Sequence, residues 1–205
     1  MSTELRWTTA DLEVMPQVEG RRYEIIDGEL YISGQPHYYH QLACTIAGSL
    51  LQEWGIQTSR GVSVGAPGII FADDETVAPD VVWCSYERLE KVLREDGKLH
   101  AAPELVIEVL SPGSANEKRD HEAKLKLYSR RGVEEYWILD WMIGRAEIYR
   151  RKQRRLRLIE TLNKSDTLKS PLLPGFACPV AELFEYPPVK NGTNGKRSAQ
   201  PNKKR

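Results

Sequence analysis

Hydrophobic and polar positions along this chain fall into short blocks with two different periods. Residues 22–33 carry apolar side chains on either side of Asp27-Gly28, a strong two-residue turn signal, and they predict a β-hairpin. Residues 145–150 and 155–161 alternate as an exposed antiparallel pair does. Three runs are nearly continuous in apolar residues, as in strands buried on both faces of a sheet: 77–83, 104–110 and 135–141.

Helical spacing is clearest in residues 37–54, where apolar side chains recur every three or four positions and Gly55 is the expected stop. A second long helix is expected over residues 114–131, with Gly132 as its stop. Shorter helices are expected at residues 9–13, 86–94 and 179–184.

These elements predict one α/β domain over residues 1–186, with a mixed central β-sheet flanked by helices and an N-terminal hairpin. Residues 187–205 are rich in Asn, Gly, Pro and Lys, and they predict a disordered basic tail. The formal net charge is zero, but the six basic residues of that tail leave 23 basic against 29 acidic residues elsewhere, a charge of about −6. An acidic body excludes the class of generic basic nucleic-acid binders.

The compartment follows from targeting signals and cysteine usage. The N-terminus lacks a basic and then apolar signal pattern, and no apolar run approaches the roughly 20 residues that cross a bilayer. We therefore expect a cytoplasmic protein without a membrane partner. Cys44, Cys84 and Cys178 lie far apart among apolar residues without zinc-like spacing, so we expect buried free thiols.

Two acidic residues interrupt the apolar runs. Glu108 stands in the middle of the run at 104–110, and Asp80 follows Pro79 at the mouth of the run at 77–83. A buried carboxylate is costly unless it is paired or binds a metal. Two such carboxylates on two core strands therefore suggest a metal site.

Lys124 is the third residue that stands out. If each residue advances about 100° around the helix axis, Leu127 falls at about −60° and Tyr128 at about +40° from Lys124, so the lysine shares the apolar face. Lys126 falls at about 200°, on the solvent side. A lysine directed at the core should have an anionic partner or a function. Because this helix directly follows the strand of Glu108, the two side chains are expected to meet over the sheet.

Two carboxylates and one ammonium suit the metal-assisted hydrolysis of a phosphodiester. Asp80 and Glu108 would hold Mg²⁺ or Mn²⁺, which prefer oxygen ligands, and the carbonyl of Val109 would be a third ligand. The metal would lower the pKa of a bound water and polarise the phosphodiester. Lys124 would position that water or stabilise the developing negative charge.

Each of these residues also has a structural explanation. Lys124 could place its stem on apolar surface and its head in water, and Asp80 could simply end a turn. Glu108 could form a buried ion pair with Lys124. The combination of all three is harder to explain by structure alone, so it favours a functional site.

The same residues resemble the PD-(D/E)XK nuclease superfamily and, within it, the Uma-two family of restriction-endonuclease-like proteins. The resemblance spans roughly residues 6–185. Its most specific stretches are residues 22–30, 78–81, 108–112, 124–128 and 132–140.

This resemblance implies a restriction-endonuclease-like α/β core and divalent-metal-dependent hydrolysis, with Asp80 and Glu108 as metal ligands. The chain departs from the superfamily pattern at Leu110, where the usual motif has a lysine. Lys124 would then be a replacement from the next helix. Glu24 matches another acidic position of the family, and it either helps to bind metal through water or is only a polar hairpin residue.

Three further polar residues lie near these positions. His40 opens the first long helix, near where a DNA backbone would pass, although a capping or surface role is favoured. Asp120 lies one turn before Lys124 and is expected to pair with it. Asp140 ends its strand, where a turn residue is favoured over a metal ligand.

We therefore expect an endonuclease that uses Mg²⁺ or Mn²⁺ and acts on nucleic acid, with DNA as the expected substrate. Asp80, Glu108 and Lys124 would be its catalytic residues, and Glu24 an accessory acid. Two alternatives from other classes stay open, namely a catalytically inactive relative that binds or regulates a partner and a purely structural domain. Because the acidic body offers no obvious DNA groove, a homodimer is one way to complete the binding surface.

Overall fold

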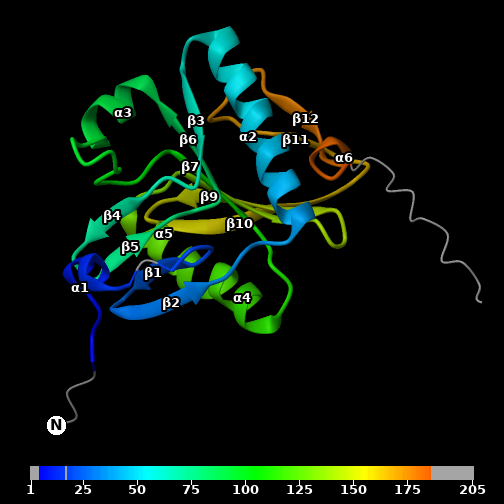
Figure 1. The fold of residues 1–205 in the computed structure, drawn as a ribbon. Coiled ribbons are helices and arrows are strands. Elements are labelled where there is room, and N and C mark those ends of the chain that lie inside the picture. The colour runs from blue at the N-terminus through cyan, green and yellow to red at the C-terminus, as the bar shows by residue number, and fades with distance from the viewer. Residues whose placement is uncertain (1–4, 17, 186–205) are drawn as a thin grey trace, which may run out of the picture.

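A mixed β-sheet with helices on both faces forms the centre of the computed structural model, which describes residues 5–16 and 18–185 (Figure 1). The predicted tail, residues 187–205, lies outside the described residues. The helices are α1 (Thr9–Val14), α2 (Tyr38–Thr58), α3 (Tyr86–Val92), α4 (Ser114–Lys118), the π-helix η1 (Arg119–Lys124), α5 (Leu125–Arg131) and α6 (Val180–Leu183). Among the helices of the described residues, none is both long and apolar enough to span a membrane.

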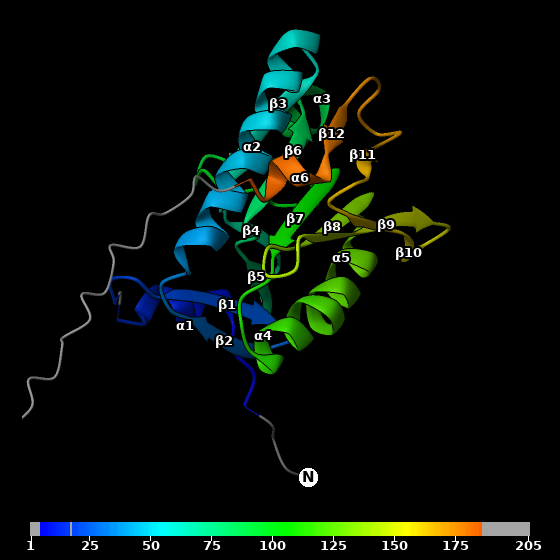
Figure 2. The ribbon, with the colours of Figure 1, turned by 90° about the vertical axis from the view of Figure 1, so that its right-hand side faces the viewer.

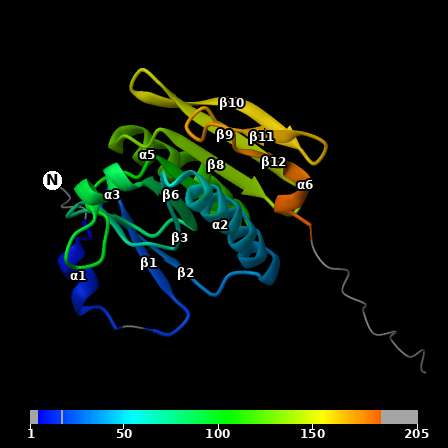
Figure 3. The ribbon, with the colours of Figure 1, turned by 90° about the horizontal axis from the view of Figure 1, so that it is seen from above.

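The described strands are β1 (Arg22–Ile26), β2 (Glu29–Ser33), β3 (Gly61–Gly65), β4 (Ile69–Ala72), β5 (Glu75–Val77), β6 (Val81–Ser85), β7 (Leu105–Val109), β8 (Glu135–Asp140), β9 (Arg145–Lys152), β10 (Arg155–Asn163), β11 (Thr167–Lys169) and β12 (Ala177–Pro179). The central sheet has the order β10-β9-β8-β7-β6-β3, which Figure 3 shows from β10 and β9 across to β6 and β3. Only β7 and β8 run parallel in this sheet. A smaller antiparallel sheet has the order β2-β1-β5-β4.

Two hydrophobic cores lie on the two faces of the central sheet. Helix α2 packs over one face and α5 over the other (Figure 2). Because side chains alternate along a strand, Leu105 and Ile107 of β7 face α2, whereas Val106 belongs to the core on the α5 side. Glu108 therefore points toward the helix that carries Lys124. The mixed sheet flanked by helices confirms the predicted α/β class.

The N-terminal hairpin forms as predicted. Strands β1 and β2 pair antiparallel from Arg22↔Ser33 to Ile26↔Glu29. The two turn residues, Asp27 and Gly28, have φ of 54° and 77°. Positive φ at both positions is what a tight two-residue hairpin turn requires.

The predicted stop of α2 at Gly55 is wrong, because the helix continues to Thr58 and Ser59 takes the left-handed cap. A Cβ atom at Gly55 would lie 2.5 Å from the carbonyl oxygen of Gly61. Glycine is therefore needed here for the close approach of α2 to β3, and not as a helix stop.

Two other boundaries differ from the prediction. The apolar run at 77–83 belongs to two strands, β5 and β6, because residues 78–80 leave the small sheet before the chain enters the central one. The expected helix at 114–131 contains the π-helix η1 between α4 and α5. The stop at Gly132 is confirmed, with φ 99°.

Candidate active site

Two carboxylates meet where β6 and β7 lie side by side. The antiparallel register places Val81 opposite Ile107, so Asp80 lies across from Glu108, one position further along. Oδ2 of Asp80 accepts a hydrogen bond from the backbone N–H of Val109, with 2.9 Å between N and O. Both side chains are buried, Asp80 at 8% exposure and Glu108 at 2%. The register therefore brings together the two acids that interrupt the apolar runs.

Lys124 lies within this cluster of acids and is 1% exposed. Its Nζ donates to Oε1 of Glu108 at 2.9 Å and lies 3.2 Å from Oε1 of Glu24. Oδ1 of Asp120 lies 3.9 Å away, one turn earlier on η1. The predicted contacts of Lys124 with Glu108 and with Asp120 are both present. Glu24 is buried too, and it also accepts from the N–H of Ala78 at 3.0 Å, so the exposed hairpin role is excluded.

A buried tyrosine completes the surroundings of Glu108. The hydroxyl of Tyr128 donates to Oε1 of Glu108 at 2.8 Å, and Lys124 donates to the same oxygen. Among the described residues, both hydrogen bonds to this carboxylate thus end on Oε1. The arrangement fixes the carboxylate and leaves Oε2 as the oxygen for another ligand.

Asp80 has a different set of partners. Nη1 of Arg22 donates to its Oδ1 at 3.1 Å, and Nε2 of His40 lies 3.2 Å from its Oδ2. Burial opposes the charge of Asp80, but the hydrogen bond and charge of His40 and the charge of Lys124 outweigh burial and hold its pKa well below the ordinary value. Asp80 is therefore ionised throughout the physiological pH range.

The pKa values of Glu108 and Lys124 are both raised in this cluster. Burial raises the pKa of Glu108 to about 8, and the neighbouring acids add to this although Lys124 opposes it. Burial lowers the pKa of Lys124, but Glu108, Glu24 and Asp120 outweigh burial and hold that pKa above 10.5. Lys124 therefore stays protonated.

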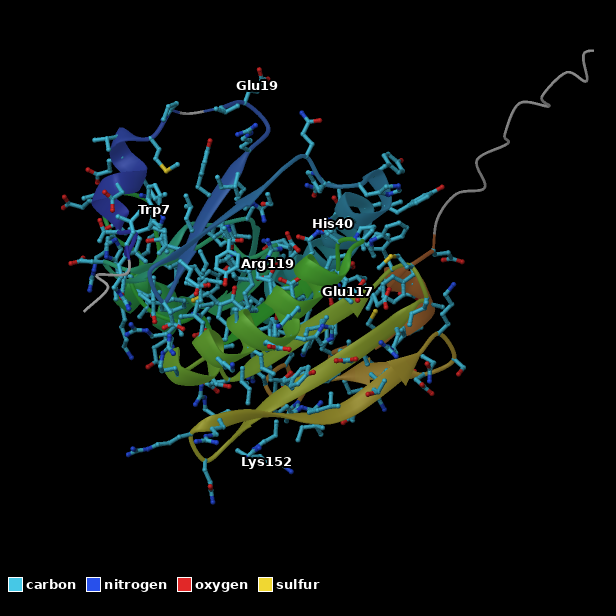
Figure 4. All side chains as sticks on the ribbon, turned by 90° about the horizontal axis from the view of Figure 1, so that it is seen from below. Trp7, Glu19, His40, Glu117, Arg119 and Lys152 are labelled. Carbon is cyan, nitrogen blue, oxygen red and sulfur yellow. The ribbon has the colours of Figure 1, made fainter. Side chains whose placement is uncertain are left out.

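The expected role of His40 as a cap or surface residue is wrong. His37 caps α2, with its Nδ1 accepting from the N–H of Tyr39, whereas His40 is 4% exposed and faces Asp80. Asp140 is a turn residue as expected, since its Oδ1 accepts from the N–H groups after it. Figure 4 shows His40 at the start of α2 and Arg119 on the helix that crosses the sheet nearby.

Two donor sets are available for a metal ion. Ligand atoms of His40, Cys44 and Asp80 all lie within 4.8 Å of one another, and among the described residues they form the one such group of three. However, Nδ1 of His40 faces Cys44 at 3.5 Å and its Nε2 faces Asp80, so one imidazole bridges two partners. Burial also raises the pKa of the Cys44 thiol, which disfavours the thiolate that a metal needs. The carboxylates of Asp80 and Glu108 are hard oxygen donors and fit Mg²⁺ or Mn²⁺ better.

A cavity of about 700 Å³ opens onto these carboxylates. Its lining contains Asp80, Glu108, Val109 and Lys124 together with the arginines Arg21, Arg22 and Arg119. Three guanidinium groups beside two carboxylates can neutralise a phosphate while a metal ion sits on the acids.

The residue pattern does not identify the three arginines or the hydroxyl of Tyr128 as part of the site. Arg22 could have been found, because residues two apart in a strand share a face and Arg22 precedes Glu24 by two positions in β1. The residue pattern places Tyr128 only on the apolar helix face. Its ring is indeed in the core, but its hydroxyl is a hydrogen-bond donor to Glu108.

Residues 9–181 match the family Uma2, described as "Putative restriction endonuclease". The chain is similar to a crystal structure described as "a putative nuclease belonging to DUF820" from Anabaena variabilis, with a TM-score of 0.68 and 17% sequence identity over 86% of this chain and 97% of that chain. At this identity the likeness shows the fold. No curated protein matches the chain.

Proposed function

The chain belongs to the Uma2 family of "putative restriction endonucleases", and from this we propose that it is a divalent-metal-dependent endonuclease whose substrate is DNA. The observation that carries the proposal is the pair Asp80 and Glu108, which share one cavity with three arginines. Buried acids of this kind are costly, and a bound cation offsets that cost.

Asp80, Glu108 and the carbonyl of Val109 would hold the metal ion. The donor set fits a hard cation, since all three groups offer oxygen and Oε2 of Glu108 is left for a ligand by the bonds to Oε1. When bound, Mg²⁺ or Mn²⁺ supplies Lewis-acid stabilisation of phosphoryl charge and makes water a stronger acid.

The chain's own residues supply the rest of the chemistry. Lys124 remains protonated, so it stabilises developing negative charge and does not act as a base. Tyr128 holds Glu108 in place, and Glu24 holds the lysine ammonium beside it. Arg22 and Arg119 line the same cavity and would bind the phosphate on either side of the cleaved bond.

Cleavage of supercoiled and linear DNA in Mg²⁺, Mn²⁺ or EDTA tests this proposal. Nicking or linearisation of the plasmid with metal, abolished by EDTA and by Asp80→Ala, is the expected result. DNA that is bound but never cut would favour the inactive binding protein instead. No binding and no cutting would leave only the structural domain. A homodimer and a cytoplasmic location stay predictions.

A further inference from the structure

Aromatic side chains cluster where α2 begins and β8 ends, and one of them, His37, lines the cavity. The ring of His37 stacks on that of Trp141, with centroids 4.7 Å apart and planes 16° apart. Tyr39 lies 5.6 Å from Trp141, and Tyr38 lies edge-on to Tyr39 at 5.5 Å. We call His37, Tyr38, Tyr39 and Trp141 the aromatic cluster.

The aromatic cluster is tied to both strands that carry the acids. Nε1 of Trp141 donates to the carbonyl of Leu110 at 3.0 Å, two residues after Glu108 and so about 7 Å along an extended chain. His37 is fixed as the cap of α2, and His40 in the first turn of that helix contacts Asp80. The rings therefore stand at a fixed short distance from the candidate metal ligands.

Part of this cluster is open to solvent. Tyr38 is 67% exposed, and in the turn that follows Trp141 the side chains of Met142 and Ile143 are 40% and 59% exposed. His37 also lines the cavity that contains Arg21, Arg22 and Arg119. An exposed aromatic surface beside a cationic pocket is the combination that binds single-stranded nucleic acid, because bases stack on the rings while the cations hold the backbone.

We propose that the aromatic cluster stacks an unpaired base next to the phosphodiester that is cut, so that the preferred substrate is single-stranded nucleic acid. This inference rests on the proposed function, because the cut phosphate is placed at Asp80 and Glu108. Paired bases inside a duplex are enclosed by their neighbours and expose no face to the rings. The net charge of about −6 outside residues 187–205 also disfavours the binding of a duplex along an extended basic surface.

Binding without metal tests the inference separately from catalysis. A fluorescent oligothymidylate of about 12 nucleotides and a duplex of the same length are titrated with full-length protein in EDTA, and anisotropy is recorded. Tyr38→Ala removes the most exposed ring, and His37→Asn removes the stacked imidazole while keeping a good helix cap. Tyr86→Ala is the matched control, since Tyr86 is also an exposed first residue of a helix, α3, at 43% exposure.

The expected result is tighter binding of the single strand than of the duplex, weakened on the order of 5- to 100-fold by Tyr38→Ala or His37→Asn and unchanged by Tyr86→Ala. Equal affinity for the duplex, no binding at all, or variants that bind like wild type would overturn the inference. The cleavage assay then separates the two proposals. If wild type cuts DNA and the Tyr38→Ala and His37→Asn variants bind and cut like wild type, the nuclease proposal is supported and the stacking site is not. If the protein binds single strands selectively but does not cut them, the stacking site is supported and the nuclease proposal is not.

Discussion

Two charge clusters join the N-terminal sheet to the helix of η1 and α5, and they differ in burial and in their balance of acids and bases. Around Lys124, one ammonium faces three carboxylates, those of Glu24, Glu108 and Asp120. Around Glu75, a buried carboxylate faces two partly exposed guanidinium groups, and Arg130 also pairs with Asp27. Its Oε1 accepts from Arg130 and its Oε2 accepts from Arg131.

The two clusters differ in whether the chain itself balances their buried carboxylates with bases. Glu75 has a cation on each oxygen, so the chain satisfies its charge without help. Around Lys124, Glu24, Glu108 and Asp120 share this ammonium and the guanidinium of Arg119, which pairs with Asp120, and the neighbouring acids contribute to the raised pKa of Glu108. A cluster in which acids outnumber bases is suited to an added cation, which would also favour the ionised form of Glu108, whereas the Glu75 cluster has a base for each acid.

The same isosteric change in each cluster should affect DNA cleavage very differently. Glu108→Gln removes a proposed metal ligand, and we expect cleavage to fall by about 10³-fold or more, since a catalytic metal supplies several kcal/mol. Glu75→Gln, measured below its unfolding temperature, should cut within about tenfold of wild type. Equal loss in both variants would remove the distinction between the clusters.

The ammonium of Lys124 should be the main stabilising group in the acidic cluster. Lys124→Met removes the ammonium that three buried acids share and leaves only Asp120 with a cation, Arg119, so we expect the free energy of unfolding to fall by about 3–5 kcal/mol in urea denaturation. Lys126→Met is the matched control on the exposed side of the same helix, and it should change stability by less than about 0.5 kcal/mol. A similar cost in both lysine variants would contradict the burial of Lys124.

The free energy of unfolding should rank Glu75→Gln and Glu108→Gln in the opposite order to their DNA cleavage. Glu75→Gln removes the anion that Arg130 and Arg131 share, although Arg130 keeps its pair with Asp27, and a loss of about 1–2 kcal/mol lies between exposed and fully buried pairs. Glu108→Gln should stay within about 1 kcal/mol of wild type, because Lys124 keeps Glu24 and Asp120 and burial already favours an uncharged side chain at this position, as the raised pKa of Glu108 indicates. A loss of several kcal/mol in Glu108→Gln would instead support a structural ion pair.

The partly exposed pair of His121 and Glu147 should have the smallest effect on stability. His121 lies 3.2 Å from Glu147, and hydrogen bonding to Glu147 raises the pKa of His121 above 6.5 although burial opposes it. A raised pKa stabilises the fold fully below the unfolded pKa of about 6.5, and that contribution is lost as pH rises through the folded pKa. The difference in unfolding free energy between wild type and His121→Gln should therefore be largest near pH 6, below about 1 kcal/mol, and vanish at alkaline pH. A difference that grows above pH 8 would contradict this pairing.

The buried charged residues could be predicted from the sequence because each of them interrupts a pattern of apolar residues. Glu108 interrupts an apolar run and Lys124 shares a helix face with Leu127 and Tyr128, so both stand out in the residue pattern alone. The helical phase holds because these two apolar residues follow Lys124 in α5, after the π-helix. The π-helix itself has no signal in the residue pattern.

The partners of Asp80 could not be predicted in the same way. Arg22 is 58 residues away and His40 is 40 residues away in sequence, and only the packing of β1 and α2 against the ends of β6 and β7 brings them together. Gly55 illustrates the same limit, since its close contact with the backbone of Gly61 depends on tertiary approach and not on local sequence.

Thermal unfolding with and without Mn²⁺ tests most directly whether the acidic cluster is a cation site. At a concentration 100 times the dissociation constant, Mn²⁺ should stabilise wild type by about 2.7 kcal/mol, or roughly 5–10 °C in Tm for a chain of this size. Glu75→Gln should keep the full shift, while Asp80→Asn and Glu108→Gln should lose it. No shift in wild type, or an equal shift in all four proteins, would contradict the site.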